Sequence, residues 1–305
     1  MNHTNKLSNG SEDHHLLDNE DNSIPETIII INCVLNAPLM LISILGNALV
    51  LAAIIRTPSI RSTHMIVLCS LAVSDLLVGL VAQPIYIGEQ LTGDQNAHRV
   101  AVMMGFSLCG VSFLTITAIT VDRFLALHYH MRYTTLVTES RVKYTLIIIW
   151  LSNFLTSCLN LWNTLLHSLI IGIIAIICLL ISTFFYIKIY CVVRRHQLQI
   201  LAQQQAVQSS DAENNLNVVR LKRSVLNSFV FYIALIICYL PAHILLTVQG
   251  LSYMNDWPTE WEFANTAVLM NSSINPFLYC WRLRRLRAAV AKTARKMLCK
   301  QTEGN

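Results

Sequence analysis

Charged residues are scarce in this chain. Only 13% of its 305 residues are Asp, Glu, Lys or Arg, and 54% are apolar. A soluble domain carries about 25% charged residues, which cover its surface. This shortage excludes a disordered chain and a nucleic-acid-binding protein, because both depend on many charged residues. The composition instead indicates a membrane protein that crosses the bilayer several times.

The sequence also lacks the patterns of metal sites and catalytic centres. It contains no C-x-x-C, G-x-S-x-G or H-E-x-x-H motif, and its histidines are scattered along the chain. Nearly all of its nine cysteines lie within apolar stretches, which is typical of small buried residues rather than of a disulfide framework. We therefore expect no enzyme, no cofactor and no metal ion other than sodium.

Long apolar stretches follow a polar and acidic N-terminal segment, residues 1–26. A membrane-spanning helix needs about 20 apolar residues. Between Tyr144 and Val193 the only formal charge is Lys188, so this segment is long enough for two spans and must turn within Asn160–Thr164. The sequence thus predicts an all-α bundle over residues 27–281. Its seven spans are expected at about 27–55, 63–88, 97–127, 142–161, 166–193, 224–250 and 260–281.

The distribution of charge predicts the orientation of the bundle. Of the 22 basic residues, 20 lie in or beside the segments 56–62, 123–143, 188–223 and 282–300, and most acidic residues lie on the opposite side. Because basic loops remain in the cytosol, we expect an extracellular N-terminus and a cytosolic C-terminus. The N-x-[ST] sequons at Asn2 and Asn9 would then be exposed to glycosylation.

Two cytosolic segments have distinct compositions. The segment 195–222 is rich in glutamine and predicts a helical extension of span five followed by a mobile stretch. In 282–305, apolar residues recur at helical spacing among many cations, which predicts a short amphipathic helix on the bilayer surface and then a tail. Cys299 in this segment is a candidate for palmitoylation, and an unmodified thiol is the equal alternative.

An ionisable residue within a span is costly and therefore points to a role. Asp75 lies in the middle of span two, and other spans carry polar residues at compatible depth. Together they predict a hydrated cluster whose oxygen atoms suit Na⁺ or a proton; a carboxyl satisfied by one neighbour is the simpler alternative. The expected members are Asp75, Asn47, Ser112, Asn271, Ser272 and Asn275.

Further polar motifs lie near the cytosolic ends of the spans. Asp122-Arg123-Phe124 closes span three, where such charges commonly act as interfacial anchors. Span seven contains Asn275-Pro276 with Tyr279 a turn later, and span six contains Pro241. Proline removes a backbone hydrogen bond and bends a helix, so spans six and seven are candidate moving parts.

In their order along the chain, these motifs resemble the signature set of rhodopsin-like (class A) G-protein-coupled receptors. The stretch that begins at Met131 resembles adenosine and melanocortin receptors, and the very short second outer loop resembles melanocortin receptors. The landmarks, from span one to span seven, are Gly46-Asn47, Asp75, Asp122-Arg123-Phe124, Trp150, Tyr186, Pro241 and Asn275-Pro276-x-x-Tyr279.

The resemblance implies a cell-surface receptor whose partners are an extracellular ligand, a heterotrimeric G protein, arrestin, a receptor kinase and the lipid bilayer. Arg123 would pair with Asp122 at rest. On activation span six would swing outward, and Arg123 would meet Tyr186, Tyr279 and the G protein. Na⁺ held near Asp75 would favour the inactive state. A seven-span transporter or ion-coupled carrier using Asp75 is the alternative, although the two halves show no repeat.

The chain departs from the family pattern at several positions. His98 replaces the usual disulfide cysteine of span three, so we expect no bridge to the second outer loop. Cys178, Leu235 and Tyr239 replace a proline, a phenylalanine and the toggle tryptophan. Leu221 replaces a glutamate that locks the switch arginine, among the cations Arg220, Lys222 and Arg223. Elevated basal activity is therefore expected.

The ligand is constrained mainly by what is missing. Gly105 occupies the place of the amine-binding aspartate, and Leu269 that of the retinal lysine, so a classical amine and retinal are both disfavoured. A peptide, a nucleoside-like ligand and an apolar small molecule all stay open, and the acidic outer segments favour a cation. The expected pocket residues are Tyr86, Glu89, His98, Gly105, Cys109, Tyr239, His243 and Asn265.

Overall fold

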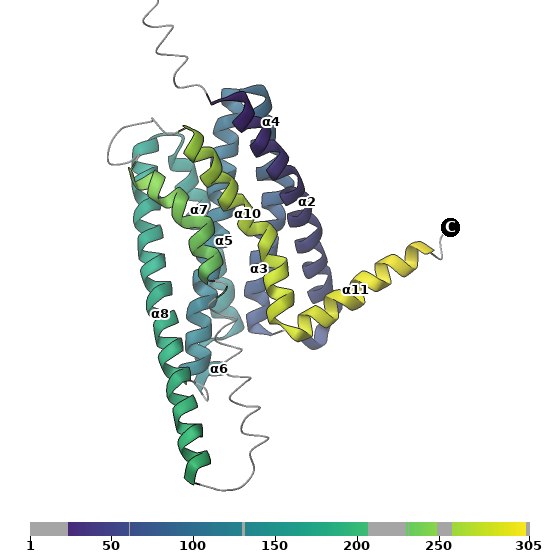
Figure 1. The fold of residues 1–305 in the computed structure, drawn as a ribbon, viewed down its shortest axis with the longest axis vertical. Coiled ribbons are helices and arrows are strands. Elements are labelled where there is room, and N and C mark those ends of the chain that lie inside the picture. The colour runs from purple at the N-terminus through teal and green to yellow at the C-terminus, as the bar shows by residue number, and fades with distance from the viewer. Residues whose placement is uncertain are drawn as a thin grey trace, which may run out of the picture.

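The computed structural model describes residues 24–60, 62–129, 132–206, 230, 232–248 and 258–302. Within these residues every regular element is helical. The long helices stand side by side in one bundle (Figure 1). They are α2 (Glu26–Arg56), α3 (Thr63–Leu77), α4 (Gln83–Thr92), α5 (Gln95–Tyr129), α7 (Glu139–Leu159), α8 (Thr164–Ala206), the helix Tyr232–Val248 and α10 (Pro258–Arg282). One further helix, α11 (Arg284–Thr302), follows α10 and lies outside this parallel arrangement.

The helices match the predicted spans closely. Of the described helices, five are long and apolar enough to cross a membrane. The shorter apolar helix Tyr232–Val248 and α10 lie where spans six and seven were predicted. The predicted turn between spans four and five is present, because α7 ends at Leu159 and α8 begins at Thr164. The all-α seven-span bundle predicted from the sequence is confirmed.

Burial in the bundle is the reverse of that in a soluble protein. Many leucine and isoleucine side chains face outward; Leu45, for example, is 68% exposed. Asparagine, serine and aspartate side chains of the same helices are buried between them. A lipid environment stabilises this arrangement, because apolar side chains contact the acyl chains and polar groups hydrogen-bond inside.

Span two is not a continuous α-helix. A π-helical segment, η2 (Val78–Ala82), separates α3 from α4. Such a segment changes the face that the following residues present. At the end of α4, Gly93 adopts φ 64 and lets the chain turn directly into α5, a left-handed conformation that favours glycine.

Close packing joins the first and last spans. A Cβ atom at Gly46 would lie 2.9 Å from Cγ of Pro276, so glycine is required where α2 approaches the bend of α10. Elsewhere Trp150 Nε1 of α7 donates to Ser70 Oγ of α3 at 3.0 Å. These contacts hold the landmark residues of four helices at defined depths.

The two segments that were predicted to be cytosolic agree with the sequence where they are described. Figure 1 shows α8 running past the rest of the bundle, as expected for a helical extension of span five, and α11 projecting sideways from the end of α10. Leu286 and Ala289 of α11 are buried while its cations lie outward, so the amphipathic helix is confirmed. Several predicted residues lie outside the described part: Asn2, Asn9, Arg220, Leu221, Lys222, Arg223 and the side chain of Cys299.

Candidate functional site

A cavity opens between the helices at the end of the bundle where α2 begins, which we call the cavity end. It holds about 1180 Å³ of space, its open mouth included, and its walls come from α4, α5, α7, α8, the helix Tyr232–Val248 and α10. All eight residues expected in the pocket line it: Tyr86, Glu89, His98, Gly105, Cys109, Tyr239, His243 and Asn265. The sequence reasoning missed Glu262, which also lines the cavity and is 5% exposed.

The mouth side of the cavity is acidic. Tyr86 donates a short hydrogen bond to Oε2 of Glu262. Gln90 Nε2 donates to Oε2 of Glu89 at 3.1 Å, and His98 Nδ1 lies 3.1 Å from Oε1 of the same carboxylate. Two carboxylates from α4 and α10 therefore meet the same cavity.

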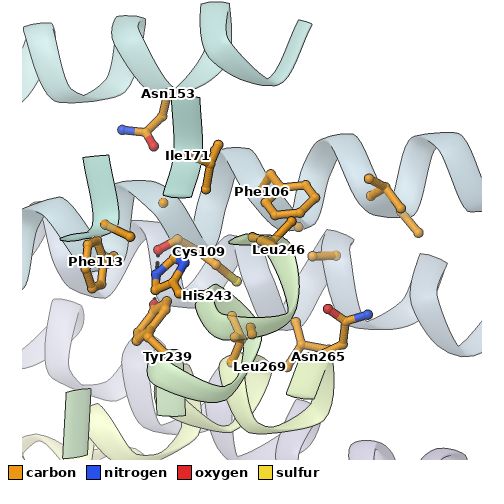
Figure 2. Close-up of a pocket in the computed structure, with 18 of the residues that line it drawn as sticks. Phe106, Cys109, Phe113, Asn153, Ile171, Tyr239, His243, Leu246, Asn265 and Leu269 are labelled. Atoms are coloured by element: carbon orange, nitrogen blue, oxygen red, sulfur yellow. Dashed lines mark hydrogen bonds between the residues drawn. The ribbon is translucent and has the colours of Figure 1, made fainter. Parts of the chain in front are cut away.

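The inner side of the cavity is aromatic. The ring centroid of Phe113 lies 5.0 Å from that of Tyr239 and 5.2 Å from that of His243. Figure 2 shows these three rings gathered at one side, with Phe106 and Asn265 at the other. Both ring nitrogens of His243 are buried without a hydrogen-bond partner, so they are available to a ligand.

Tyr239 connects the cavity to the middle of the bundle. Its hydroxyl donates to the carbonyl of Cys109 at 3.0 Å and accepts from Asn271 Nδ2 at 3.3 Å. Asn271 was expected beside Asp75, but its described hydrogen bond goes to Tyr239 instead. The phenol thus joins α5 and α10 through two hydrogen bonds.

Asp75 is fully buried at the centre of a polar cluster. Its Oδ1 accepts from Ser112 Oγ at 2.9 Å, and its Oδ2 accepts from Asn275 Nδ2 at 2.8 Å. Among the described residues no cation lies within 4.0 Å of this carboxylate. A buried carboxylate that has only neutral partners is costly.

Further polar residues of the cluster donate hydrogen bonds to backbone carbonyl groups around Asp75. Ser43 Oγ donates to the backbone carbonyl of Asp75 at 2.8 Å, and Asn47 Nδ2 donates to the carbonyls of Ser43 and Ser272 at 2.9 and 3.1 Å. The side-chain oxygens of Asn47 and Asn275 are buried without a hydrogen-bond partner. Carboxylate, hydroxyl and amide oxygens are ligands that a hard cation prefers, so these residues fit Na⁺.

At the opposite end of the bundle, which we call the Arg123 end, the structure differs from the expectation. Arg123 Nη2 makes a short contact with His64 Nε2. No ion pair within 4.0 Å joins Arg123 to Asp122 in the described structure. This structure therefore does not show the predicted pair, because Arg123 is engaged by His64 and Asp122 by Tyr133; the resting pair stays a prediction.

Asp122 has partners of its own. Tyr133 donates to its Oδ1 at 2.6 Å, and His64 Nδ1 lies 3.6 Å from its Oδ2. Tyr133 belongs to the short helix α6 (Tyr133–Leu136), outside the spans. Burial and the Asp122 carboxylate raise the pKa of the Tyr133 phenol above its usual range, so the phenol keeps its proton and remains a donor.

Tyr186 and Phe124 also lie near this end, whereas Pro241 lies between the cavity-lining residues Tyr239 and His243. Tyr186 accepts a hydrogen bond from Thr120 Oγ1 at 3.3 Å. Phe124 stacks on His128 with ring centroids 5.2 Å apart. Tyr279 is completely buried, whereas Pro241 lies in the exposed face of its helix.

Two of the missed residues carried a signal in the sequence. His64 precedes Asp75 by about three helical turns, which places both on one face of a helix. Glu262 precedes Asn265 and Thr266 by one turn, so it shares their inward face. Neither spacing reveals which neighbouring helix His64 or Glu262 contacts, so the sequence alone does not identify them as site residues.

The comparisons with known proteins agree with this architecture. The chain belongs to the 7 transmembrane receptor (rhodopsin) family, whose model matches residues 46–168 and 157–279. It is 25% identical to the adenosine receptor A2b of Gallus gallus, with 92% of this chain and 91% of that protein covered. It is 26% identical to the histamine H2 receptor of Canis lupus familiaris, with coverages of 93% and 83%.

A melanocortin receptor 4 of Danio rerio is also 26% identical, with 85% of this chain and 81% of that protein covered. The chain is thus a multi-pass plasma-membrane receptor that signals through G proteins in response to an extracellular ligand, and it is not an enzyme. The carrier alternative is rejected. The resemblance to class A receptors inferred from the sequence is confirmed.

Proposed function

We propose that the cavity binds the extracellular ligand and that ligand binding activates the G protein through an outward movement of the helix Tyr232–Val248 around Arg123. In this proposal the N-terminus is extracellular and the C-terminus is cytosolic. The charge distribution supports that orientation, since 20 of the 22 basic residues lie on the Arg123 side. The cavity then opens to the outside, and Arg123 lies at the cytosolic end of the bundle.

The observation that carries the proposal is the position of Tyr239. This residue lines the cavity, bonds Cys109 and Asn271, and lies two residues before Pro241. A ligand that displaces the phenol would break contacts to α5 and α10 beside a helix bend. Such a helix has two packed arrangements, and a ligand favours the one that it binds better.

Arg123 is the residue that we propose engages the G protein. In the described arrangement its guanidinium is held inside the bundle by His64, and it is therefore unavailable to a cytosolic partner. We take this as the resting state. When span six moves, Arg123 exchanges His64 for Tyr186, Tyr279 and the G protein. The free energy of this exchange is small if the new partners accept as many hydrogen bonds from the guanidinium as are lost.

We also propose that Na⁺ binds at Asp75 in the resting state. Asp75, Ser112 and Asn275 would hold it directly, with Asn47, Asn271 and Ser272 in support. The bound ion would supply the counter-charge that the buried carboxylate lacks. Because this cluster adjoins Tyr239 through Asn271, occupancy of the cluster and of the cavity would influence each other.

Basal activity is proposed to be high. A neutral imidazole accepts a hydrogen bond from Arg123 but does not neutralise its charge, so it holds the guanidinium less tightly than a carboxylate does. The replacement of the locking glutamate by Leu221, among three cations, acts in the same direction. We further propose arrestin and receptor-kinase binding at this face, N-glycans on Asn2 and Asn9, and a palmitoyl group on Cys299 next to an amphipathic helix.

GTPγS loading of G proteins tests the function. Membranes that contain the wild-type chain should load more GTPγS than membranes without it, and Arg123→Ala should remove most of that excess. Arg132→Ala, an exposed arginine at the same end, is the matched control and should load like the wild type. Equal loading in all three chains would contradict the role of Arg123, and no loading above empty membranes would contradict the proposed function.

A further inference from the structure

The cavity has an acidic side and an aromatic side, and the basic groups among its lining residues are His98 and His243. Glu89 and Glu262 line its mouth side, and no Lys or Arg is among its lining residues. His98 is the basic group beside the carboxylates, and its side chain is 55% exposed. A ligand that enters the cavity therefore meets two carboxylates before it reaches the aromatic rings.

Both carboxylates retain acceptor capacity. An ionised carboxylate has about four acceptor positions. Glu262 accepts from Tyr86, and Glu89 accepts from Gln90 and His98. Neither has a Lys or Arg partner within 4.0 Å among the described residues. Their side chains are nevertheless enclosed, with 14% of Glu89 and 5% of the Glu262 residue exposed.

Enclosed carboxylates are costly without a full counter-charge; Glu262 has none within 4.0 Å among the described residues, and Glu89 has only the half-exposed His98. An incoming cation removes that cost. This cation cannot take the position used in classical amine receptors, because Gly105 provides no side chain there. The acidic groups instead come from α4 and α10. The charged end of the ligand is thereby turned toward the mouth of the cavity.

The other end of the ligand must match the inner side. Phe113, Tyr239 and His243 form a cluster of rings with centroids 5.0 to 6.0 Å apart, and Leu246 and Leu269 also line the cavity. An aromatic or branched apolar group buries its surface there and contacts Tyr239, the residue on which the proposed movement depends.

We infer that the natural ligand is a cationic amphiphile, with an ammonium or guanidinium group at Glu89 and Glu262 and an aromatic or apolar body against Phe113, Tyr239 and His243. This inference rests on the proposed function of the cavity and deepens it. An anionic ligand is disfavoured, because it would bring a negative charge beside two enclosed carboxylates.

Matched probes test the charge requirement. The probes are ω-phenylalkylamines with linkers from ethyl to hexyl, the corresponding phenylalkylguanidines, and the phenylalkanols of equal length as neutral controls. Binding is measured as the shift in melting temperature of the purified full chain, which needs no G protein, and signalling as GTPγS loading. At least one amine or guanidine of the series should bind about 10-fold or more tightly than its alcohol.

Carboxylate variants locate the charge. Glu262→Gln keeps an acceptor for Tyr86 and should weaken the best cationic probe by about 10- to 100-fold, with little change for the alcohol. Glu89→Gln should act in the same direction and serves as the test if Glu262→Gln is not monodisperse. Glu260→Gln, an exposed glutamate of the same helix, is the control and should bind like the wild type.

The two readouts separate the proposals. Equal binding of alcohols and cations, or cation binding that both glutamine variants retain, would overturn the inference. Basal GTPγS loading that needs Arg123 would in that case still support the receptor mechanism. Conversely, charge-dependent binding without any GTPγS loading would support the inference and contradict the proposed function.

Discussion

The two ends of the bundle contain charged side chains with different kinds of partner: the carboxylates Glu89 and Glu262 at the cavity end, and the guanidinium of Arg123 at the other. At the cavity end, Glu89 and Glu262 have neutral donors and a half-exposed histidine as partners. At the Arg123 end, the guanidinium is engaged by His64, and Asp122 is engaged by Tyr133. The first end leaves its charge beside an open cavity, whereas the second covers it with side chains of the same chain. The carboxylates at the cavity end are therefore accessible to a ligand, whereas Arg123 must first lose its contact with His64 before it can bind another partner.

His64→Leu should produce the largest change at the Arg123 end. Leucine fills similar volume but cannot accept from Arg123, so the resting arrangement loses one charge-assisted hydrogen bond. A loss of about 1.4 kcal/mol raises the ratio of active to resting receptor about tenfold. Basal GTPγS loading at equal surface expression measures it.

Tyr133→Phe provides the comparison for this variant. It removes a donor from Asp122 but leaves the Arg123–His64 contact in place, so its effect on basal loading should be only about twofold. If the two variants load equally, His64 is not the residue that restrains Arg123, and the contrast between the two ends disappears.

Asp75→Asn should remove the sodium dependence of basal GTPγS loading, which is a smaller effect than that of His64→Leu. The proposed sodium site lies between the two ends of the bundle. Wild-type basal loading should be about fivefold lower in NaCl than in KCl at equal ionic strength. The variant should load equally in both salts, because asparagine offers the cation no charge. Asp94→Asn, an exposed aspartate at the cavity end, should keep the salt difference; a difference that persists in Asp75→Asn would refute the sodium site.

Gly46→Ala should have the smallest effect on signalling but a measurable one on stability. The new methyl group would lie 2.9 Å from Pro276, and such overpacking costs about 1–3 kcal/mol. Gly88→Ala is the matched control, since a Cβ there meets nothing within 4 Å; it should be neutral or stabilise by about 0.5–1 kcal/mol. Melting temperatures of the purified chains decide, and equal values would contradict the close helix contact.

Much of the candidate site could be predicted from the sequence because its signals are local or strongly constrained by the membrane. A carboxylate such as Asp75 within a span must face inward, and hydroxyl and amide groups at the same depth are its obvious partners. Ser112 and Asn275 are indeed bonded to it. The pocket residues were predicted partly as polar residues near the ends of spans and partly from the positions that the family resemblance implies.

The sequence by itself determined the number of spans, their approximate positions and the amphipathic helix, because apolar length and helical periodicity are properties of each segment alone. Only the tertiary structure decided that His64 meets Arg123, that Tyr133 meets Asp122 and that Glu262 faces the cavity. Such pairings depend on how each helix is rotated against its neighbours. In span two that rotation also depends on η2, since a π-helical turn shifts the face of every residue that follows it.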